Sequence, residues 1–294
     1  MDDLKPWLKS TQKRVDSALG KFLPRESARP STIHKAMRYS VFAGGKRLRP
    51  ILTLAAAEAC GGETEHALAP ACATEVMHTY SLVHDDLPCM DDDDLRRGRP
   101  TSHKVFGEGM AVLTGDALLT EVFTIIAQTP ATARYSVRDY VEEIATTGGS
   151  KKLIGGQVLD LEGEGKSLTK KDLIRIHEAK TAALLTCAVR LGAMTANATP
   201  RKLEALTTFG YNLGLAFQVI DDILDVTQTT EVLGKTAGKD EAVDKSTYPA
   251  ILGLEKSRKE AARLTKKALD SLSVFGKKGA RLEQIARYLL DREY

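Results

Sequence analysis

The chain has few aromatic residues, few cysteines and almost no net charge, and each scarcity excludes a class of protein. Phe, Trp and Tyr make up 5% of the 294 residues, too few for a surface that stacks carbohydrate or single-stranded nucleic acid. Lys and Arg (42) nearly balance Asp and Glu (39), which argues against a general nucleic-acid binder. The cysteines form no CxxC pair, which excludes a disulfide scaffold and a cysteine-ligated zinc site. They are Cys60, Cys72, Cys89 and Cys187.

Long apolar segments and targeting signals are also missing. No stretch reaches the roughly 18 unbroken apolar residues that a membrane span needs. The N-terminal segment MDDLKPWLKS lacks the apolar core of a signal peptide, and the C-terminal DREY carries no lipidation motif. We therefore expect a cytoplasmic protein with no membrane span. No linker or internal repeat divides the sequence, which predicts one domain over residues 1–294.

What recurs along the chain is the spacing of an amphipathic helix. Apolar residues fall three and four positions apart, among residues of high helix propensity, and alternating strand patterns are missing. The pattern predicts an all-α bundle of about ten or more helices. Two segments, 104–127 and 201–228, are apolar over much of their circumference, which indicates burial in a core or a subunit interface. The full set of segments is 31–42, 47–60, 64–87, 104–127, 169–194, 201–228 and 257–273.

Two acidic clusters interrupt this apolar pattern. The first places six carboxylates within residues 85–94, where like charges repel by roughly 1 kcal/mol per close pair even in water. The second, within residues 221–225, lies inside an apolar segment. Acidic runs usually belong to solvated loops. Because these two are attached to apolar helices, they indicate a functional site.

The spacing within each cluster suits a metal site. Asp221 and Asp225 are four residues apart and therefore lie on one face of a helix, about 40° from each other. Asp85 and Asp91 are six residues apart, and Pro88 between them predicts a bulge or helix end that lets Asp91 turn back. Carboxylate oxygens are the ligands that Mg²⁺ prefers, with phosphate oxygens completing its coordination. We expect the two clusters to face each other across the bundle and to hold Mg²⁺.

Cationic segments suited to phosphate lie near these clusters. The segment 44–50, GGKRLRP, opens a helix after a glycine turn, where free N–H groups and the helix dipole favour an anion. Arg96 and Arg97 follow the first acidic cluster directly, and the arginine fork binds phosphate in a bidentate manner. Lys180 and Lys235 add donors later in the chain. Each of these lysines taken alone is more often a solvated surface residue, so only the set is informative.

Taken in order, the motifs resemble those of the polyprenyl synthetase family, and in particular short-chain trans-prenyl diphosphate synthases of the bacterial farnesyl type. The paired DDx₄D and DDxxD motifs, the second with FQ before it, are highly specific. The matching segments are GGKRLRP (44–50), HTYSLVHDDLPCMDDDDLRRGRPT (78–101), GGQVLDL (155–161), KT (180–181), FQVIDDILD (217–225) and GKTAGKD (234–240). They span nearly the whole chain, which makes a chance similarity negligible.

The resemblance implies a single all-α domain around a deep central cavity, a homodimer, and three Mg²⁺ ions in each active site. It assigns metal binding to Asp85, Asp91 and Asp221, with Asp86, Asp222 and Asp225 in supporting positions. It assigns the allylic diphosphate to Arg96, Lys180, Lys235 and Lys245, the reacting centre to Thr181 and Gln218, and isopentenyl diphosphate to Lys46, Arg49, His78 and Arg97. His78 alone would more often be an ordinary helix histidine, so its role rests on the resemblance.

The reaction that the resemblance implies is Mg²⁺-dependent chain elongation. An allylic diphosphate loses its diphosphate, the terminal alkene carbon of isopentenyl diphosphate attacks the resulting cation, and the released diphosphate takes one proton. A class I terpene cyclase also uses an acidic metal cluster, but it needs no second diphosphate clamp of the kind that GGKRLRP and RRGRPT supply. A non-catalytic binding subunit would be expected to have eroded acidic motifs, and these are intact.

The expected product is farnesyl diphosphate (C15), formed from dimethylallyl or geranyl diphosphate, with geranylgeranyl diphosphate (C20) as the alternative. Tyr80 stands five residues before Asp85, which is roughly 7.5 Å along a helix and about one to two isoprene units. A ring at that depth is expected to form the floor of the pocket, because overpacking a dense apolar cavity costs about 1–3 kcal/mol. Ser81 is too small for this role.

Overall fold

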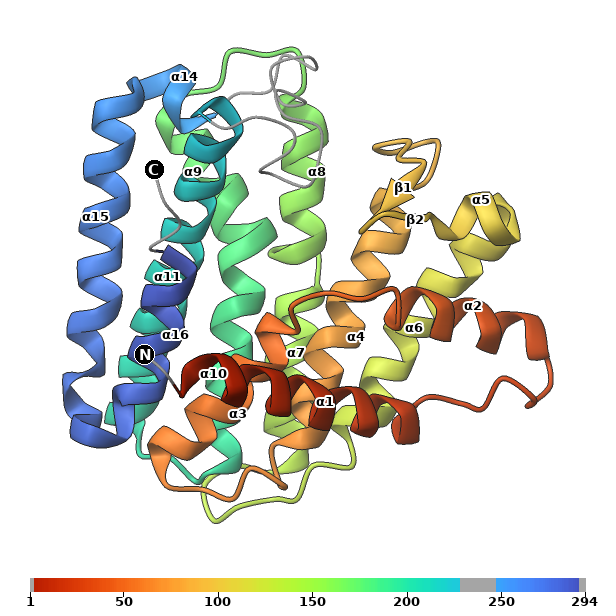
Figure 1. The fold of residues 1–294 in the computed structure, drawn as a ribbon, viewed down its shortest axis with the longest axis horizontal. Helices are drawn as coiled ribbons and strands as arrows, with labels where there is room; N and C mark the ends of the chain where they lie inside the picture. Colours follow the sequence, from red (N-terminus) through yellow and green to blue (C-terminus); the bar gives the residue numbers. More distant parts are fainter. Residues whose placement is uncertain (1–2, 228–246, 291–294) are drawn as a thin grey trace.

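Helices make up nearly all of the regular structure in the computed structural model, which describes residues 3–227 and 247–290. Figure 1 shows a group of long, roughly parallel helices, with α1 running across them from the N-terminus and α2 at the right of the view below α5. The strands of the described ranges, β1 and β2, form a two-residue antiparallel ladder that pairs Leu95 with Pro100. The predicted all-α fold class is therefore confirmed.

The elements follow one another without a long connection in the described ranges. In chain order they are α1 (Leu4–Phe22), α2 (Ser31–Val41), α3 (Leu48–Cys60), α4 (Leu68–Asp85), β1 (Leu95–Arg96), β2 (Arg99–Pro100), α5 (Ser102–Phe106), α6 (Glu108–Ile126), α7 (Val137–Gly148), α8 (Leu153–Gly163), α9 (Lys170–His177), η1 (Glu178–Ala182), α10 (Ala183–Thr195), α11 (Pro200–Thr227), α14 (Tyr248–Leu252), α15 (Leu254–Ser271), η2 (Leu272–Gly279) and α16 (Ala280–Leu290).

Each predicted helical segment holds at least one observed helix, although three of them differ in detail. The segment 64–87 becomes helical only at Leu68, because the residues before it form turns. The segment 104–127 is broken at Gly107, whose φ of 84° ends α5. The segment 169–194 contains η1, one turn of π-helix between α9 and α10.

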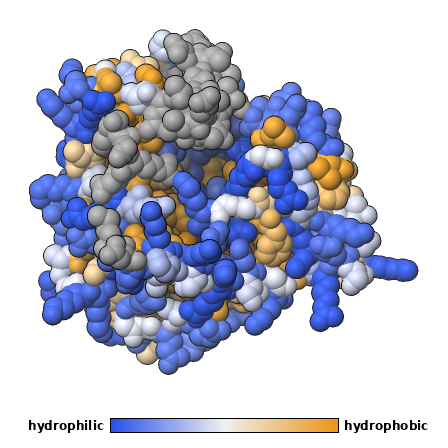
Figure 2. All heavy atoms as spheres, viewed as in Figure 1, coloured by the Kyte–Doolittle hydropathy of each residue, from blue (hydrophilic) through white to orange (hydrophobic). Residues whose placement is uncertain are grey.

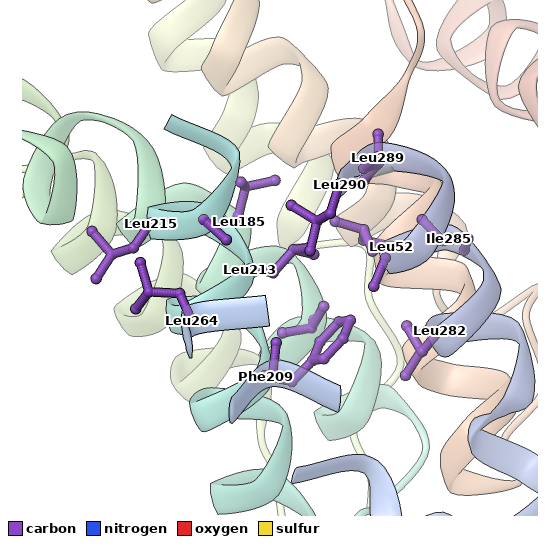
Figure 3. Packing of buried hydrophobic residues seen from close by; sticks show 14 of the residues in the cluster. Leu52, Leu185, Phe209, Leu213, Leu215, Leu264, Leu282, Ile285, Leu289 and Leu290 are labelled. Carbon is purple, nitrogen blue, oxygen red and sulfur yellow. The ribbon is translucent and has the colours of Figure 1, made fainter. Parts of the chain in front are cut away.

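A first core forms where α11 packs against α15, α16 and α10, and α3 joins it by packing against α10 and α16. Figure 3 shows Phe209 and Leu213 of α11 among Leu264, Leu282 and Ile285 of the C-terminal helices. All five side chains are at most 2% exposed. Burial of such side chains is the main favourable contribution to folding, and here it fixes the helix that carries the second acidic cluster.

A second core surrounds α4, the helix that leads to the first acidic cluster. Val76 and Met77 of α4 are fully buried against Leu118 and Val122 of α6. Helix α10 contributes side chains to both cores, including Leu185 in the first and Leu184 in the second. The helices that carry the two acidic clusters are thus packed against a common helix.

Helix α6 is unusually apolar for a helix of which only part is buried. By length and composition it would pass as a membrane span, with 39% of its most apolar window buried. One helix of this kind is weak evidence for a membrane, since core helices of globular proteins meet the same criteria. Its apolar residues include Val112 and Leu113, which are 41% and 55% exposed.

Candidate active site

The first acidic cluster begins where α4 ends. Helix α4 stops at Asp85, and the chain then turns sharply around Pro88. The backbone N–H of Asp91 donates a 2.8 Å hydrogen bond to the carbonyl of Asp85, and Met90 donates one of the same length to Leu87. The return of Asp91 toward Asp85 follows the prediction made from Pro88.

Asp86 and Arg96 form an ion pair beneath this turn. The Nε of Arg96 donates to Oδ1 of Asp86 at 2.8 Å, and a terminal nitrogen of Arg96 lies 3.1 Å from Asp93. The Asp86 side chain is 5% exposed. Burial raises the pKa of Asp86, although the hydrogen bond from Arg96 opposes that shift. Asp86 therefore supports the acidic loop from inside, while Asp91 is exposed.

Asp85 has the most informative electrostatics of the predicted metal ligands. Burial raises its pKa to about 6, and the carboxylates of Asp91 and Asp86 act in the same direction, whereas Lys180 lowers it. A carboxylate whose charge is disfavoured in this way gains most from a bound cation. All three predicted ligands, Asp85, Asp91 and Asp221, offer the hard oxygen donors that suit Mg²⁺. The donor set fits that metal.

The π-turn η1 carries Lys180 and Thr181 into the site. Two glycines allow neighbouring helices to touch it. A β-carbon on Gly156 of α8 would lie 2.4 Å from the backbone nitrogen of Lys180, and one on Gly214 of α11 would lie 2.5 Å from Ala182. Such contacts are too short for any side chain. π-Turns inside helices are frequent at functional sites, and this one is held between two close-packed helices.

The second acidic cluster is connected to η1 through Gln218. The hydroxyl of Thr181 donates to Oε1 of Gln218 at 3.2 Å, and Nε2 of Gln218 donates to Oδ1 of Asp222 at 3.1 Å. The other oxygen of Asp222 accepts the backbone N–H of Tyr248 at 3.0 Å. Asp222 and Asp225 are buried, whereas Asp221 is partly exposed. These contacts agree with a supporting position for Asp222.

A cavity of about 540 Å³ brings many of the predicted residues together. Its polar end holds Asp85, Lys180 and Thr181, and most of the remaining wall is apolar. Figure 2 shows apolar surface in a recess between the part of the molecule built on α11 and α15 and the part built on α4 and α6. The full lining is Arg49, His78, Tyr80, Ser81, Leu82, His84, Asp85, Leu87, Cys89, Met90, Val112, Leu153, Ile154, Gln157, Val158, Leu161, Lys180 and Thr181.

Tyr80, the expected floor of the pocket, is one of the residues that line this cavity, and it is 4% exposed. Its ring contacts the imidazole of His84 edge to face, with ring centres 6.0 Å apart. His84 is held in turn by the carbonyl of Val112, 3.0 Å from Nε2. A β-carbon on Gly115 would lie 2.0 Å from the same nitrogen, so α6 approaches this ring pair closely.

Three of the residues assigned to isopentenyl diphosphate are close together. Burial lowers the pKa of His78 well below its ordinary value, and the charges of Arg49 and Arg97 act in the same direction. Burial also lowers the pKa of Arg49, to about 10. Arg97 donates a hydrogen bond to the carbonyl of Gly44, at the start of the loop that carries Lys46. Two guanidinium groups beside the His78 imidazole favour binding of a multiply charged anion.

Some expectations fall outside this geometry. Lys235 and Lys245 lie outside the described residues. Within the described residues, one group of His and carboxylate side chains could hold a metal ion by distance alone. It consists of Asp92, Asp94 and His103, whose ligand atoms lie within 4.8 Å of one another. Its two aspartates are exposed, and the predicted ligands form no such group by themselves. A larger hollow of about 820 Å³ lies on the other face of η1, beside Glu143 and Arg190, and holds none of the predicted site residues.

Sequence reasoning missed three residues that support the site. Asp160 forms an ion pair with Lys180, with 2.6 Å between the charged atoms. It belongs to the GGQVLDL segment (155–161), whose side chains have no predicted role in the sequence analysis. Arg47 and Glu75 form a buried ion pair of 2.9 Å behind Arg49. The available signal for Glu75 was that it is the one carboxylate among residues 68–84.

Comparison with known proteins finds relatives that match nearly the whole chain. Residues 30–286 match the family described as polyprenyl synthetase. The chloroplastic geranylgeranyl pyrophosphate synthase of Capsicum annuum is 51% identical over 267 residues, which cover 90% of this chain and 72% of the relative. The large subunit 1 of the heterodimeric geranylgeranyl pyrophosphate synthase of Arabidopsis thaliana, also chloroplastic, is 49% identical over 95% of this chain and 76% of its own length.

Solved structures share the fold as well as the sequence. An FPP/GFPP synthase from Zymomonas mobilis superposes with a TM-score of 0.86 at 34% identity, and the match covers 98% of this chain and 99% of that one. At this identity and coverage, the helices that carry both acidic clusters belong to the matched region.

Proposed function

Because the chain belongs to the polyprenyl synthetase family and its reaction is prenyl chain elongation, we propose that its product is geranylgeranyl diphosphate (C20). The cavity in which Asp85 and Lys180 meet an apolar wall is the proposed site of elongation, and the names of the relatives carry the proposed chain length. Two relatives that are 51% and 49% identical to this chain are named geranylgeranyl pyrophosphate synthases. Their names support a C20 product over the C15 product expected from the sequence.

The polar end of the cavity would bind the allylic diphosphate. Asp85, Asp91 and Asp221 would hold Mg²⁺, and we propose three ions per site as the family resemblance implies. When bound, Mg²⁺ supplies positive charge that stabilises the developing charge on the leaving diphosphate. Lys180 and Arg96 would add fixed cationic donors to the same group, together with Lys235 and Lys245. Charges preorganised in this way act mainly on the transition state.

The apolar wall would protect the allylic cation once diphosphate leaves. Ile154, Val158 and Leu161 of α8 and Val112 of α6 line the cavity, and none of them offers a nucleophile. Water in contact with the cation would convert it to an alcohol, so an apolar lining favours elongation. In the proposed site, Thr181 and Gln218 flank the reacting centre, and the released diphosphate accepts the proton.

Isopentenyl diphosphate would bind on the cationic side formed by Lys46, Arg49, His78 and Arg97. Arg49 and His78 line the same cavity as Asp85, so this second substrate would lie beside the allylic one. Reaction between two bound substrates needs this juxtaposition, because it replaces the entropy cost of a bimolecular encounter.

Farnesyl diphosphate (C15) is the second candidate product, and Tyr80 is the observation that favours it. Its buried ring lies on the cavity wall about one and a half helical turns before Asp85. Apolar residues of α8 also line the cavity, so the tail could extend along α8 instead of ending at Tyr80. Chain length depends on whether the tail stops at this ring or passes it along Ile154 and Val158.

We also propose that residues 1–294 form a single domain and that the protein acts as a homodimer. The apolar side chain of Leu113 on α6, which is 55% exposed and outside the cavity lining, supports a subunit contact on that helix. The Arabidopsis relative is named as the large subunit of a heterodimer, so the oligomeric state needs its own measurement. The predicted cytoplasmic location stays a prediction, since both plant relatives are chloroplastic.

The test is product analysis with purified protein, Mg²⁺ and labelled isopentenyl diphosphate. Dimethylallyl, geranyl and farnesyl diphosphates are supplied in separate reactions, and the products are sized by mass spectrometry. We expect all three primers to give a C20 product. A reaction that stops at C15 and leaves farnesyl diphosphate unused would favour the second candidate. A cyclised hydrocarbon, or no elongation at all, would contradict the proposed function.

A further inference from the structure

The loop that leads into α3 has an unusual backbone. Gly44, Gly45 and Arg47 all have positive φ, of 98°, 123° and 50°. Gly residues adopt this region freely, but a residue with a β-carbon rarely does, so Arg47 must be held there by its surroundings. Lys46 and Arg49, two of the proposed isopentenyl diphosphate ligands, flank this residue. The loop conformation therefore decides where both cations lie.

The side chain of Arg47 is what holds the loop. It is 3% exposed, and its guanidinium donates to the carbonyl of Val41 at 2.8 Å and to the carbonyl of Gly44 at 3.4 Å. It also donates to Oδ1 of Asp16 at 2.8 Å and to Oε1 of Glu75 at 2.9 Å. One planar group thus joins the last residue of α2 and the loop backbone at Gly44 to α1 and α4, which only a rigid fork of donors can do.

Glu75 is the buried anion at the centre of this arrangement. Its side chain is 2% exposed, one turn before His78 on α4. A buried carboxylate is stable when it is paired and hydrogen-bonded, and Arg47 meets that need. The charge of Glu75 also favours the charged form of Arg49, whose pKa burial lowers. Glu75 thus acts on the cationic group as well as on the loop.

Two further contacts tie the same loop. Nε2 of Gln12 donates to the carbonyl of Gly45 at 2.8 Å, and Arg97 donates to the carbonyl of Gly44. A β-carbon on Gly45 would lie 2.4 Å from a terminal nitrogen of Arg97. Because Gly45 has no side chain, the guanidinium of Arg97 can lie directly against the loop backbone.

We propose that Arg47 and Glu75 are positioning residues for isopentenyl diphosphate: both are buried, and they act by holding Lys46 and Arg49 in place. The inference rests on the proposed function, which assigns those two cations to that substrate. It predicts that disturbing the buried pair weakens one substrate selectively. A merely structural ion pair would instead lower stability, or affect both substrates alike.

The experiment compares Glu75→Gln with Glu143→Gln. Both variants remove the carboxylate of an arginine pair, since Glu143 accepts from Arg190 at 2.8 Å, but the second pair is remote from the loop. For Glu75→Gln we expect the KM for isopentenyl diphosphate to rise about tenfold, with the allylic KM within about twofold of wild type. For Glu143→Gln we expect no change in either KM. Equal rises in both KM values for Glu75→Gln, or no rise, would overturn the proposal.

A second variant decides the matter if Glu75→Gln fails to fold. Arg47→Lys keeps the positive charge beside Glu75 but cannot reach Asp16 and both backbone carbonyls at once. The same selective rise in the KM for isopentenyl diphosphate supports the proposal, and an unchanged KM overturns it. The proposed function is tested separately by the wild type. A wild-type product of C15 would contradict the C20 proposal and leave this inference standing, whereas absence of elongation would remove the basis of both.

Discussion

The ammonium of Lys180 lies 2.6 Å from Oδ2 of Asp160, and this contact joins the π-turn η1 to helix α8. The two side chains are 27% and 11% exposed, so solvent screens the pair only in part. Lys180 is also close enough to Asp85 to lower the pKa of that carboxyl. Asp160 therefore fixes the direction of a cation that faces the proposed metal site.

Asp160→Asn tests this relationship. The amide keeps the shape of the side chain but loses the charge that orients Lys180. We expect kcat to fall about tenfold and the KM for the allylic diphosphate to rise, because a donor that is no longer preorganised stabilises the transition state less. Steady-state kinetics with each substrate varied in turn measure both effects.

Asp270→Asn is the matched control, since Asp270 pairs with Lys266 at 2.6 Å on the exposed surface of α15. Exposed pairs of this kind contribute little, so its kinetics should equal those of the wild type. An Asp160→Asn enzyme with wild-type kinetics would show that Lys180 needs no partner.

The sequence predicts the helices well because apolar spacing reports burial directly. Phe209 and Leu213, four residues apart in the segment predicted as 201–228, face the same core as expected. Pro88 likewise predicted the turn after Asp85. In both cases the signal is local, since it depends on the spacing or the backbone chemistry of neighbouring residues.

Features that depend on contacts between distant segments could not be predicted in this way. The π-turn at Lys180 exists where Gly156 and Gly214 let two other helices press against it, and no pattern within residues 169–194 contains that information. The partners of Arg47 are Asp16 and Glu75, 31 and 28 positions away. Periodicity identifies a buried face but not which buried charge meets which.

Alanine at either acidic cluster should abolish most activity. We expect Asp85→Ala and Asp221→Ala each to lower kcat about 10²-fold or more, because each change removes an oxygen ligand whose charge acts mainly in the transition state. Rates at saturating substrates and Mg²⁺, with folding checked by circular dichroism, give the comparison. Near-normal turnover in either variant would rule out that residue as a metal ligand.

Asp85 should lower the free energy of unfolding of the metal-free protein at neutral and alkaline pH. Burial raises the pKa of Asp85 to about 6, above the roughly 3.9 of an unfolded Asp. Between these two values the folded state binds more protons than the unfolded state, so the free energy of unfolding falls as pH rises through that window. Above it, the wild type carries a buried charge that Asp85→Asn lacks.

Thermal unfolding in EDTA checks the sign of this effect. We expect Asp85→Asn to melt at a higher temperature than the wild type at pH 8, and the difference to shrink at pH 5. Saturating Mg²⁺ should stabilise the wild type more than the variant, because binding to the folded state alone raises the free energy of unfolding. A variant less stable than the wild type at pH 8 in EDTA would contradict the electrostatic account of Asp85.

Tyr80 gives the sharpest test of product length, because its ring is buried on the cavity wall and fixed against His84. Truncation in Tyr80→Ala opens space roughly 7.5 Å before Asp85, where a tail blocked by the ring would otherwise clash. Because the proposed C20 product requires a tail that passes this ring, we expect Tyr80→Ala to keep making C20, measured by mass spectrometry with farnesyl diphosphate as primer. An enzyme that stops at C15 because of this ring would instead lengthen its product by at least one C5 unit. Tyr80→Phe keeps the ring and should leave the product unchanged. If Tyr80→Ala makes the same product as the wild type, the tail passes Tyr80 along α8, and Ile154 and Val158 become the next positions to enlarge.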